Sequence, residues 1–163
     1  ANTQKSNIVY NPAKHQIANI VQETIEFHNN FAQQKEVELI SHVGQQLSSY
    51  CDHTLTSVII RNLISNAIKF TPKKGSVTVF AEKINGEEIR VSVKDTGIGM
   101  DKDISRKLFD TTDVISTHGT ENEKGSGLGL KICAEFVKIN KGQIWIDSEP
   151  GNGSTVHFTM PAK

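Results

Sequence analysis

The chain has 163 residues, and its 18 lysine and arginine residues balance 18 aspartate and glutamate residues. This length fits one domain whose core needs neither disulfides nor a structural metal. The balanced charge gives no basic excess of the kind that binds nucleic acid or an anionic membrane surface. No apolar run reaches the roughly 20 residues that a membrane helix needs.

The two cysteines, Cys51 and Cys133, lie far apart in the sequence among apolar neighbours. Zinc and redox motifs place their cysteines closer together, so we expect two buried thiols that pack as small apolar side chains. The amino-terminal residues have no signal-peptide layout. These features favour a reducing, cytoplasmic module that contacts neither nucleic acid nor the membrane directly.

The first part of the chain predicts one long helix and two short strands. Residues 1–11 are polar and lead, in extended conformation, to a helix start at Pro12. From Pro12 to about Lys35 the apolar residues recur at helical spacing. Strands are expected around residues 37–43 and 50–51, which contain short apolar runs.

The segment 52–71 contains no proline or glycine, and it predicts a second helix. At about 100° per residue, its apolar residues gather on one broad arc. Asn62, Asn66 and Lys69 lie on a narrow strip on the opposite side. An amide oxygen is a hard, neutral ligand for Mg²⁺, and a lysine offers a point charge to phosphate oxygens. The strip therefore predicts a metal and phosphate site, although a solvated helix face has the same pattern.

A hairpin follows this helix, because alternating apolar residues flank Asn85-Gly86. Its second strand runs into Asp95-Thr96-Gly97-Ile98-Gly99. A carboxylate at the end of an apolar strand is costly to bury unless a donor such as an adenine amine binds it. Glycines remove Cβ atoms where a flat base lies on the main chain. An ordinary Asp-Gly turn has the same sequence.

A short helix with Leu108 and Phe109 on its apolar side is expected next. Residues 110–125 show no periodicity, and a loop of that length is typical of a functional lid. The run from Gly125 to Leu130 then opens a helix, where free amides and the helix dipole form an anion site that phosphates can approach. A flexible loop has the same composition, and the spacing matches neither the dinucleotide nor the P-loop fingerprint.

Residues 144–146 and 156–160 predict a closing hairpin. Helices mixed with antiparallel hairpins favour an α+β fold, a two-layer α/β sandwich, over a doubly wound parallel sheet.

Taken together, these motifs resemble the catalytic, ATP-binding domain of sensor histidine kinases, within the superfamily shared with gyrase, heat-shock chaperone and mismatch-repair ATPases. The N box corresponds to residues 62–71, the first glycine box to 95–99, the F box to 108–109 and the second glycine box to 125–130. The segment 142–161 matches these kinases as well. The resemblance covers about residues 12–161.

The resemblance implies a Bergerat-type fold, with a mixed, mostly antiparallel sheet packed on three helices. Residues 12–163 are expected to form the ATP-binding domain, with a lid at about 110–125. Residues 1–11 are expected to lead in from a dimerisation and phosphoacceptor domain.

Roles for single residues also follow from the resemblance. Asn66 is expected to hold Mg²⁺, Asn62 to support the phosphate end and Lys69 to contact phosphate. Phe70 is expected to flank the base or ribose, and Asp95 to accept a hydrogen bond from the adenine amine. The other nucleotide contacts that the resemblance implies are Gly97, Ile98, Gly99, Lys124, Gly125, Ser126, Gly127, Leu128, Gly129, Leu130 and Thr155.

Two departures from the family pattern stand out. Lids of this family often carry an arginine where this chain has His118, so Lys124 is our candidate for the basic lid contact. None of the six histidines is followed by the Glu, Arg or Asn, and Pro expected around a phosphoacceptor histidine. We therefore expect a fragment that does not phosphorylate itself.

The resemblance implies a protein histidine kinase of a two-component phosphorelay. With ATP and Mg²⁺, it would donate the γ-phosphate to a histidine on the dimerisation domain of the same parent protein. A response regulator receiver domain would be an indirect partner.

Two alternatives are an ATPase like gyrase or the chaperones and a catalytically silent nucleotide-binding adaptor. Those ATPases carry a glutamate four residues before the metal asparagine, where this chain has Asn62, so hydrolysis should be slow. The full set of nucleotide-contact residues argues against the adaptor.

Overall fold

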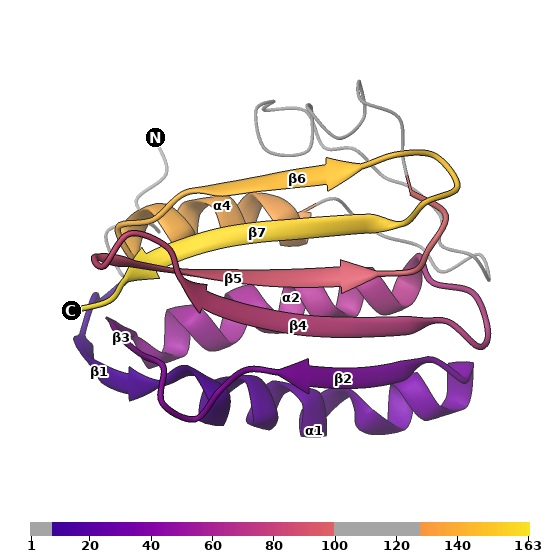
Figure 1. The fold of residues 1–163 in the computed structure, drawn as a ribbon, viewed down its shortest axis with the longest axis horizontal. Helices are drawn as coiled ribbons and strands as arrows, with labels where there is room; N and C mark the ends of the chain where they lie inside the picture. Colours follow the sequence, from indigo (N-terminus) through magenta and orange to yellow (C-terminus); the bar gives the residue numbers. More distant parts are fainter. Residues whose placement is uncertain (1–7, 100–127) are drawn as a thin grey trace.

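The computed structural model describes residues 8–99 and 128–163. In these residues three helices cover one face of a five-stranded sheet, and two further strands form a small separate sheet (Figure 1). The elements are β1 (Pro12–Gln16), α1 (Ile17–Lys35), β2 (Glu38–His42), β3 (Ser48–Asp52), α2 (His53–Lys69), β4 (Ser76–Lys83), β5 (Glu88–Asp95), α4 (Leu128–Ile139), β6 (Ile144–Ser148) and β7 (Ser154–Pro161).

The main sheet has the strand order β2-β4-β5-β7-β6. Its pairs are antiparallel except β2 with β4, which is parallel. Side chains alternate between the two faces of a strand, and Ile89, Val91 and Val93 of β5 are all buried. The predicted two-layer sandwich with a mixed, mostly antiparallel sheet is therefore confirmed.

The first helix begins at Ile17, later than the pattern predicted. The prediction of a helix from Pro12 was wrong, because Pro12–Gln16 form β1 and pair antiparallel with β3. None of these five side chains is fully buried, whereas Ile17 has no exposed surface. Pairing with a strand distant in sequence therefore decides the conformation of a segment that contributes little to the core.

A buried polar network fixes the start of α2. The Asp52 side chain caps the helix, since Oδ1 accepts the Leu55 N–H at 2.9 Å. Asn140, which follows α4 and has no exposed surface, accepts the Asp52 N–H at 3.0 Å and donates to Thr56 Oγ1 at 2.9 Å. The end of α4 is thereby tied to the beginning of α2.

The two cysteines have the expected environment. Both are free and buried, and the Cys133 thiol lies 3.6 Å from the main-chain oxygen of Ile59. Burial raises the pKa of Cys133 to about 12 and also raises the pKa of Cys51. Both side chains are therefore protonated near neutral pH and pack in the core.

Within the two described stretches, none of the helices has the length and hydrophobicity of a transmembrane span.

The sheet face opposite the helices carries a row of side chains, one from each strand of the main sheet. They are His42, Phe80, Ser92, His157 and Trp145. The rings of Trp145 and His157 stack with their centroids 5.3 Å apart. His157 Nδ1 lies 2.7 Å from Ser92 Oγ, and its Nε2 lies 3.0 Å from Asp147 Oδ2.

A serine, a histidine and an aspartate that are linked by hydrogen bonds can form a catalytic triad with serine as the nucleophile. The surroundings of Ser92 do not support that role. Ser92 lies within β5, whose main chain pairs with β4 on one side and β7 on the other. Few main-chain amides are therefore left there to stabilise an oxyanion. The chain of hydrogen bonds links β5, β7 and β6 and has a structural role.

The burial of His157 makes the stability of the fold depend on pH. Burial lowers the pKa of His157 from its ordinary value of 6.5, with Asp147 acting in the opposite direction. As the pH falls below about 6.5, the unfolded chain takes up this proton before the folded one, so the free energy of unfolding should decrease. His157→Gln should remove this part of the decrease. Urea unfolding measured from pH 7.5 to 5 tests this, and identical pH slopes for wild type and variant would contradict it.

Candidate functional site

The helix α2 presents Asn62 to the start of α4. The Asn62 amide nitrogen donates to the Val58 carbonyl at 3.0 Å, which orients the side chain. A Cβ on Gly129, in the first turn of α4, would lie 3.1 Å from Asn62 Oδ1. The glycine therefore lets the main chain of α4 pass close to the N box. The structure thus places the second glycine box, which includes Gly129, next to the N box, which includes Asn62.

The polar strip of α2 is more enclosed than a solvated helix face. Asn66 is half-buried, and only 9% of the Lys69 surface is exposed. The Lys69 ammonium lies 4.9 Å from the centroid of the Phe70 ring, within the range of a cation–π contact. Burying an ammonium is costly unless it interacts with polar or charged groups. The strip is therefore not an open, solvated helix face.

Asp95 ends β5 with 7% of its surface exposed. Its Oδ1 accepts the N–H of Gly97 at 2.8 Å and the N–H of Ser154 at 3.2 Å. Burial raises the pKa of the carboxyl, and these two hydrogen bonds lower it. Among the described residues none donates to Oδ2. One oxygen is therefore fixed by the main chain, while the other can accept from a ligand.

The first glycine box packs directly on the end of α2. The Ile98 N–H donates to the Phe70 carbonyl at 3.2 Å. A Cβ on Gly97 would collide with this same carbonyl, so any larger residue would separate the two segments. Gly99 has a φ of +69° and contacts the main chain of Glu149, where only glycine fits without strain. These glycines place Asp95 beside the last turn of α2.

Thr155 lies differently from its neighbour Ser154. Thr155 is opposite Lys94 and Asp147 in the sheet, and both of those residues are exposed. By alternation its side chain belongs to the open face, whereas Ser154 is buried and donates its main-chain N–H to Asp95. Sequence reasoning missed Ser154. The alternation along β7 could have found it, since Ser154 shares its face with Phe158.

A polar depression of about 440 Å³ lies at this end of the sheet and includes both Asp95 and Thr155 in its wall. Its lining residues are Lys94, Asp95, Asp147, Ser148, Glu149, Asn152, Gly153, Ser154 and Thr155. Thr155 therefore stays close to Asp95 even though its side chain belongs to the open face.

The remaining predicted contacts fall into two groups. Ile98 is half-exposed beside Asp95, and Leu130 in α4 is partly buried against the core. The predicted lid (110–125), the F box (108–109) and four predicted contacts lie outside the described residues. These four are Lys124, Gly125, Ser126 and Gly127. Leu128 begins α4.

The donor set of the site fits a magnesium ion bound through phosphate. Within residues 8–99 and 128–163, no group of three or more His, Cys, Asp or Glu side chains could hold a metal ion. Mg²⁺ commonly keeps several waters and is held by one or two protein oxygens together with phosphate oxygens. The single amide of Asn66, one helical turn after Asn62 in α2, suits that arrangement.

The comparisons with known proteins agree with this geometry. The family described as "Histidine kinase-, DNA gyrase B-, and HSP90-like ATPase" matches residues 51–163. The adaptive-response sensory kinase SasA of Crocosphaera subtropica is 36% identical over 140 residues, which cover 85% of this chain and 36% of SasA. The chain thus spans little more than a third of that relative.

Two solved structures have the same fold. The catalytic domain of histidine kinase ThkA has a TM-score of 0.79 at 20% identity and covers 93% of this chain and 97% of its own. Full-length ShkA in complex with AMPPNP has a TM-score of 0.80 at 28% identity and covers 94% of this chain and 32% of its own. The family match, which extends over the N box, both glycine boxes and the closing strands, shows that this chain belongs to the histidine kinase-, DNA gyrase B- and HSP90-like ATPases.

Proposed function

We propose that this chain is the ATP-binding catalytic domain of a sensor histidine kinase. In this role it donates the γ-phosphate of ATP to a histidine on the dimerisation domain of the same parent protein. The observation that carries the proposal is the Asp95 carboxyl, which is buried, fixed through Oδ1 and able to accept through Oδ2. Residues 12–163 form the proposed domain, and residues 1–11 lead in from the dimerisation domain.

Recognition of adenine follows from the chemistry of Asp95. Its carboxylate oxygen accepts a hydrogen bond from the amine of adenine, whereas guanine presents a carbonyl at the same position. Two acceptors facing each other in a buried site lose their hydrogen bonds to water without gaining a new one. The half-exposed Ile98 offers an apolar surface beside the base, and Gly97 and Gly99 let this segment pack closely against the Phe70 carbonyl and the main chain of Glu149.

The phosphate end of the proposed site combines several weak contributions. Asn66 would hold Mg²⁺, whose charge reduces the repulsion among the phosphate oxygens. Lys69 supplies a fixed positive charge, and the start of α4 next to Asn62 supplies main-chain amides. Phosphoryl transfer requires little covalent chemistry from the protein, so positioning and charge neutralisation account for the catalysis.

Asn62 favours transfer over hydrolysis. In the gyrase- and chaperone-like members that this sequence resembles, a glutamate at this position activates water. Here the position holds an amide whose nitrogen is bonded to the Val58 carbonyl. An amide takes up no proton near neutral pH. A bound ATP would therefore be preserved until a phosphoacceptor histidine reaches it.

The proposed partners are the dimerisation domain and, indirectly, a receiver domain. A structure of ThkA in complex with the response regulator protein TrrA covers 98% of this chain with a TM-score of 0.80. This similarity supports a place in a two-component system for a domain of this fold. The two buried thiols are consistent with a reducing, cytoplasmic compartment.

Binding and transfer can be tested separately. Calorimetry with Mg·ATP and Mg·GTP should show ATP binding at least about tenfold tighter, because the opposed acceptors at Asp95 disfavour guanine. Labelled ATP should leave the chain alone unphosphorylated and label a dimerisation domain of the same parent protein when it is added. Equal affinity for ATP and GTP would refute the adenine site, and no transfer despite tight ATP binding would refute the kinase role.

The variant Asp95→Asn should weaken ATP binding without destabilising the fold. Burial raises the pKa of the Asp95 carboxyl, which means that the charged form is destabilised in the folded chain. The neutral amide keeps an oxygen for the Gly97 and Ser154 amides, so the variant should unfold at the same temperature as wild type or higher. It should bind ATP at least about tenfold more weakly, because it can present its amide nitrogen to the adenine amine. Thermal unfolding and calorimetry measure both, and a stable variant with unchanged ATP affinity would contradict the assigned role.

A further inference from the structure

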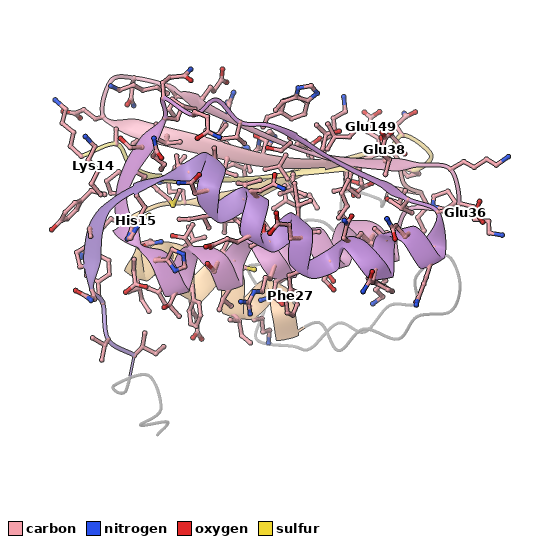
Figure 2. All side chains as sticks on the ribbon, turned by 90° about the horizontal axis from the view of Figure 1, so that it is seen from below. Lys14, His15, Phe27, Glu36, Glu38 and Glu149 are labelled. Carbon is pink, nitrogen blue, oxygen red and sulfur yellow. The ribbon has the colours of Figure 1, made fainter. Side chains whose placement is uncertain are left out.

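The helices α1 and α2 lie side by side with their carboxyl ends at the same end of the molecule (Figure 1). Figure 2 shows the end of α1, where Glu36 is labelled. The last carbonyls of each helix lack partners within the helix and carry a partial negative charge. Two such ends placed together repel each other unless a positive group lies between them.

Lys35, the last residue of α1, supplies that group. Its Nζ donates to the Ile68 carbonyl at 2.9 Å and to the Lys69 carbonyl at 2.8 Å. The residue has only 4% of its surface exposed, so the ammonium is removed from most of its water. A buried ammonium needs hydrogen-bond acceptors, and these two carbonyls provide them. Lys35 therefore acts as a cap for α2 that comes from another helix.

The residue after Lys35 strengthens this junction. Glu36 has a φ of +60° and ends α1 in the left-handed conformation. Its carbonyl accepts the Lys74 N–H at 2.8 Å, and its carboxylate lies 3.2 Å from the Lys73 ammonium. The end of α1 thus holds both the last turn of α2 and the connection that leaves it.

The two carbonyls that Lys35 binds directly precede the Phe70 carbonyl, which contacts the first glycine box on the adenine side of the proposed site. The Ile68 and Lys69 carbonyls bind Lys35, and the next carbonyl, that of Phe70, accepts the Ile98 N–H. The side chains of Asn66 and Lys69 belong to the same helical turn. One lysine therefore fixes the point where the phosphate side and the adenine side of the site meet.

We propose that Lys35 is a positioning residue of the nucleotide site, an inference that rests on the proposed ATP-binding function. Its ammonium holds the last turn of α2 so that Asn66 and Lys69 keep a fixed separation from Asp95. Without it, the Lys69 carbonyl loses this donor and the Ile68 carbonyl keeps the Thr71 N–H, so the turn that carries both side chains loosens. ATP, which spans both sides, then binds more weakly.

The test compares Lys35→Met, which removes the ammonium and keeps most of the stem, with Thr56→Val in the 163-residue chain. Thr56 is buried at the opposite end of α2 and accepts from Asn140, so its loss should destabilise the fold without reaching the site. Both variants are measured at a temperature where circular dichroism shows them folded. Lys35→Met should weaken ATP binding at least about tenfold, the scale of losing a supporting residue. Thr56→Val should stay within about twofold, since distant sites act independently.

A folded Lys35→Met variant with wild-type ATP affinity would overturn the proposal, as would an equal loss in Thr56→Val. Wild-type chain that fails to bind ATP would instead reject the proposed function. If Lys35→Met does not fold, NMR of wild-type chain decides. The Lys35 Nζ resonance and the carbonyl resonances of residues 68 and 69 should shift when ATP saturates the site. Resonances that stay unchanged would overturn the positioning role.

Discussion

The burial of the Asp95 carboxyl at the end of β5 is the constraint on which the rest of the site depends. A carboxylate with so little exposed surface is stable only where donors reach it, and Gly97 and Ser154 reach one of its oxygens. These contacts require the chain to turn sharply after β5 and bring β7 alongside. Within the part of the chain that the structure describes, no residue donates to the other oxygen, and this oxygen would connect the fold to the proposed selection of a base.

The proposed function also requires that this carboxyl stays at a fixed distance from the side chains of Asn66 and Lys69 in α2. The Phe70 carbonyl provides the link, because it ends the helix and accepts from Ile98 in the glycine box. Lys35 holds the two preceding carbonyls from α1, and the Asp52 cap with Asn140 holds the opposite end of the helix. Lys35 thus fixes the end of the helix next to the proposed site, and the Asp52 cap fixes the end remote from it.

Elements whose pattern lies within one short segment could be predicted from the sequence. The segment 52–71 gave a helix, observed as His53–Lys69 with Asp52 as its cap, and Asn85-Gly86 gave the hairpin between β4 and β5. β1 was missed, because its conformation comes from pairing with β3 and not from its own side chains. The contacts of Lys35 and Ser154 are also non-local, joining residues more than 30 positions apart. The family motifs predict which residues form the site, and that assignment stays a prediction, whereas the burial of Lys69 required the structure.

The most direct measurement is an NMR titration of the Asp95 side-chain carboxyl carbon, with and without saturating Mg·ATP. Burial raises the pKa of this group in the free chain. A hydrogen bond from the adenine amine favours the charged carboxylate, so ATP should lower the pKa of Asp95, and GTP at the same concentration should not. An Asp95 pKa that is the same with and without bound ATP would contradict the account.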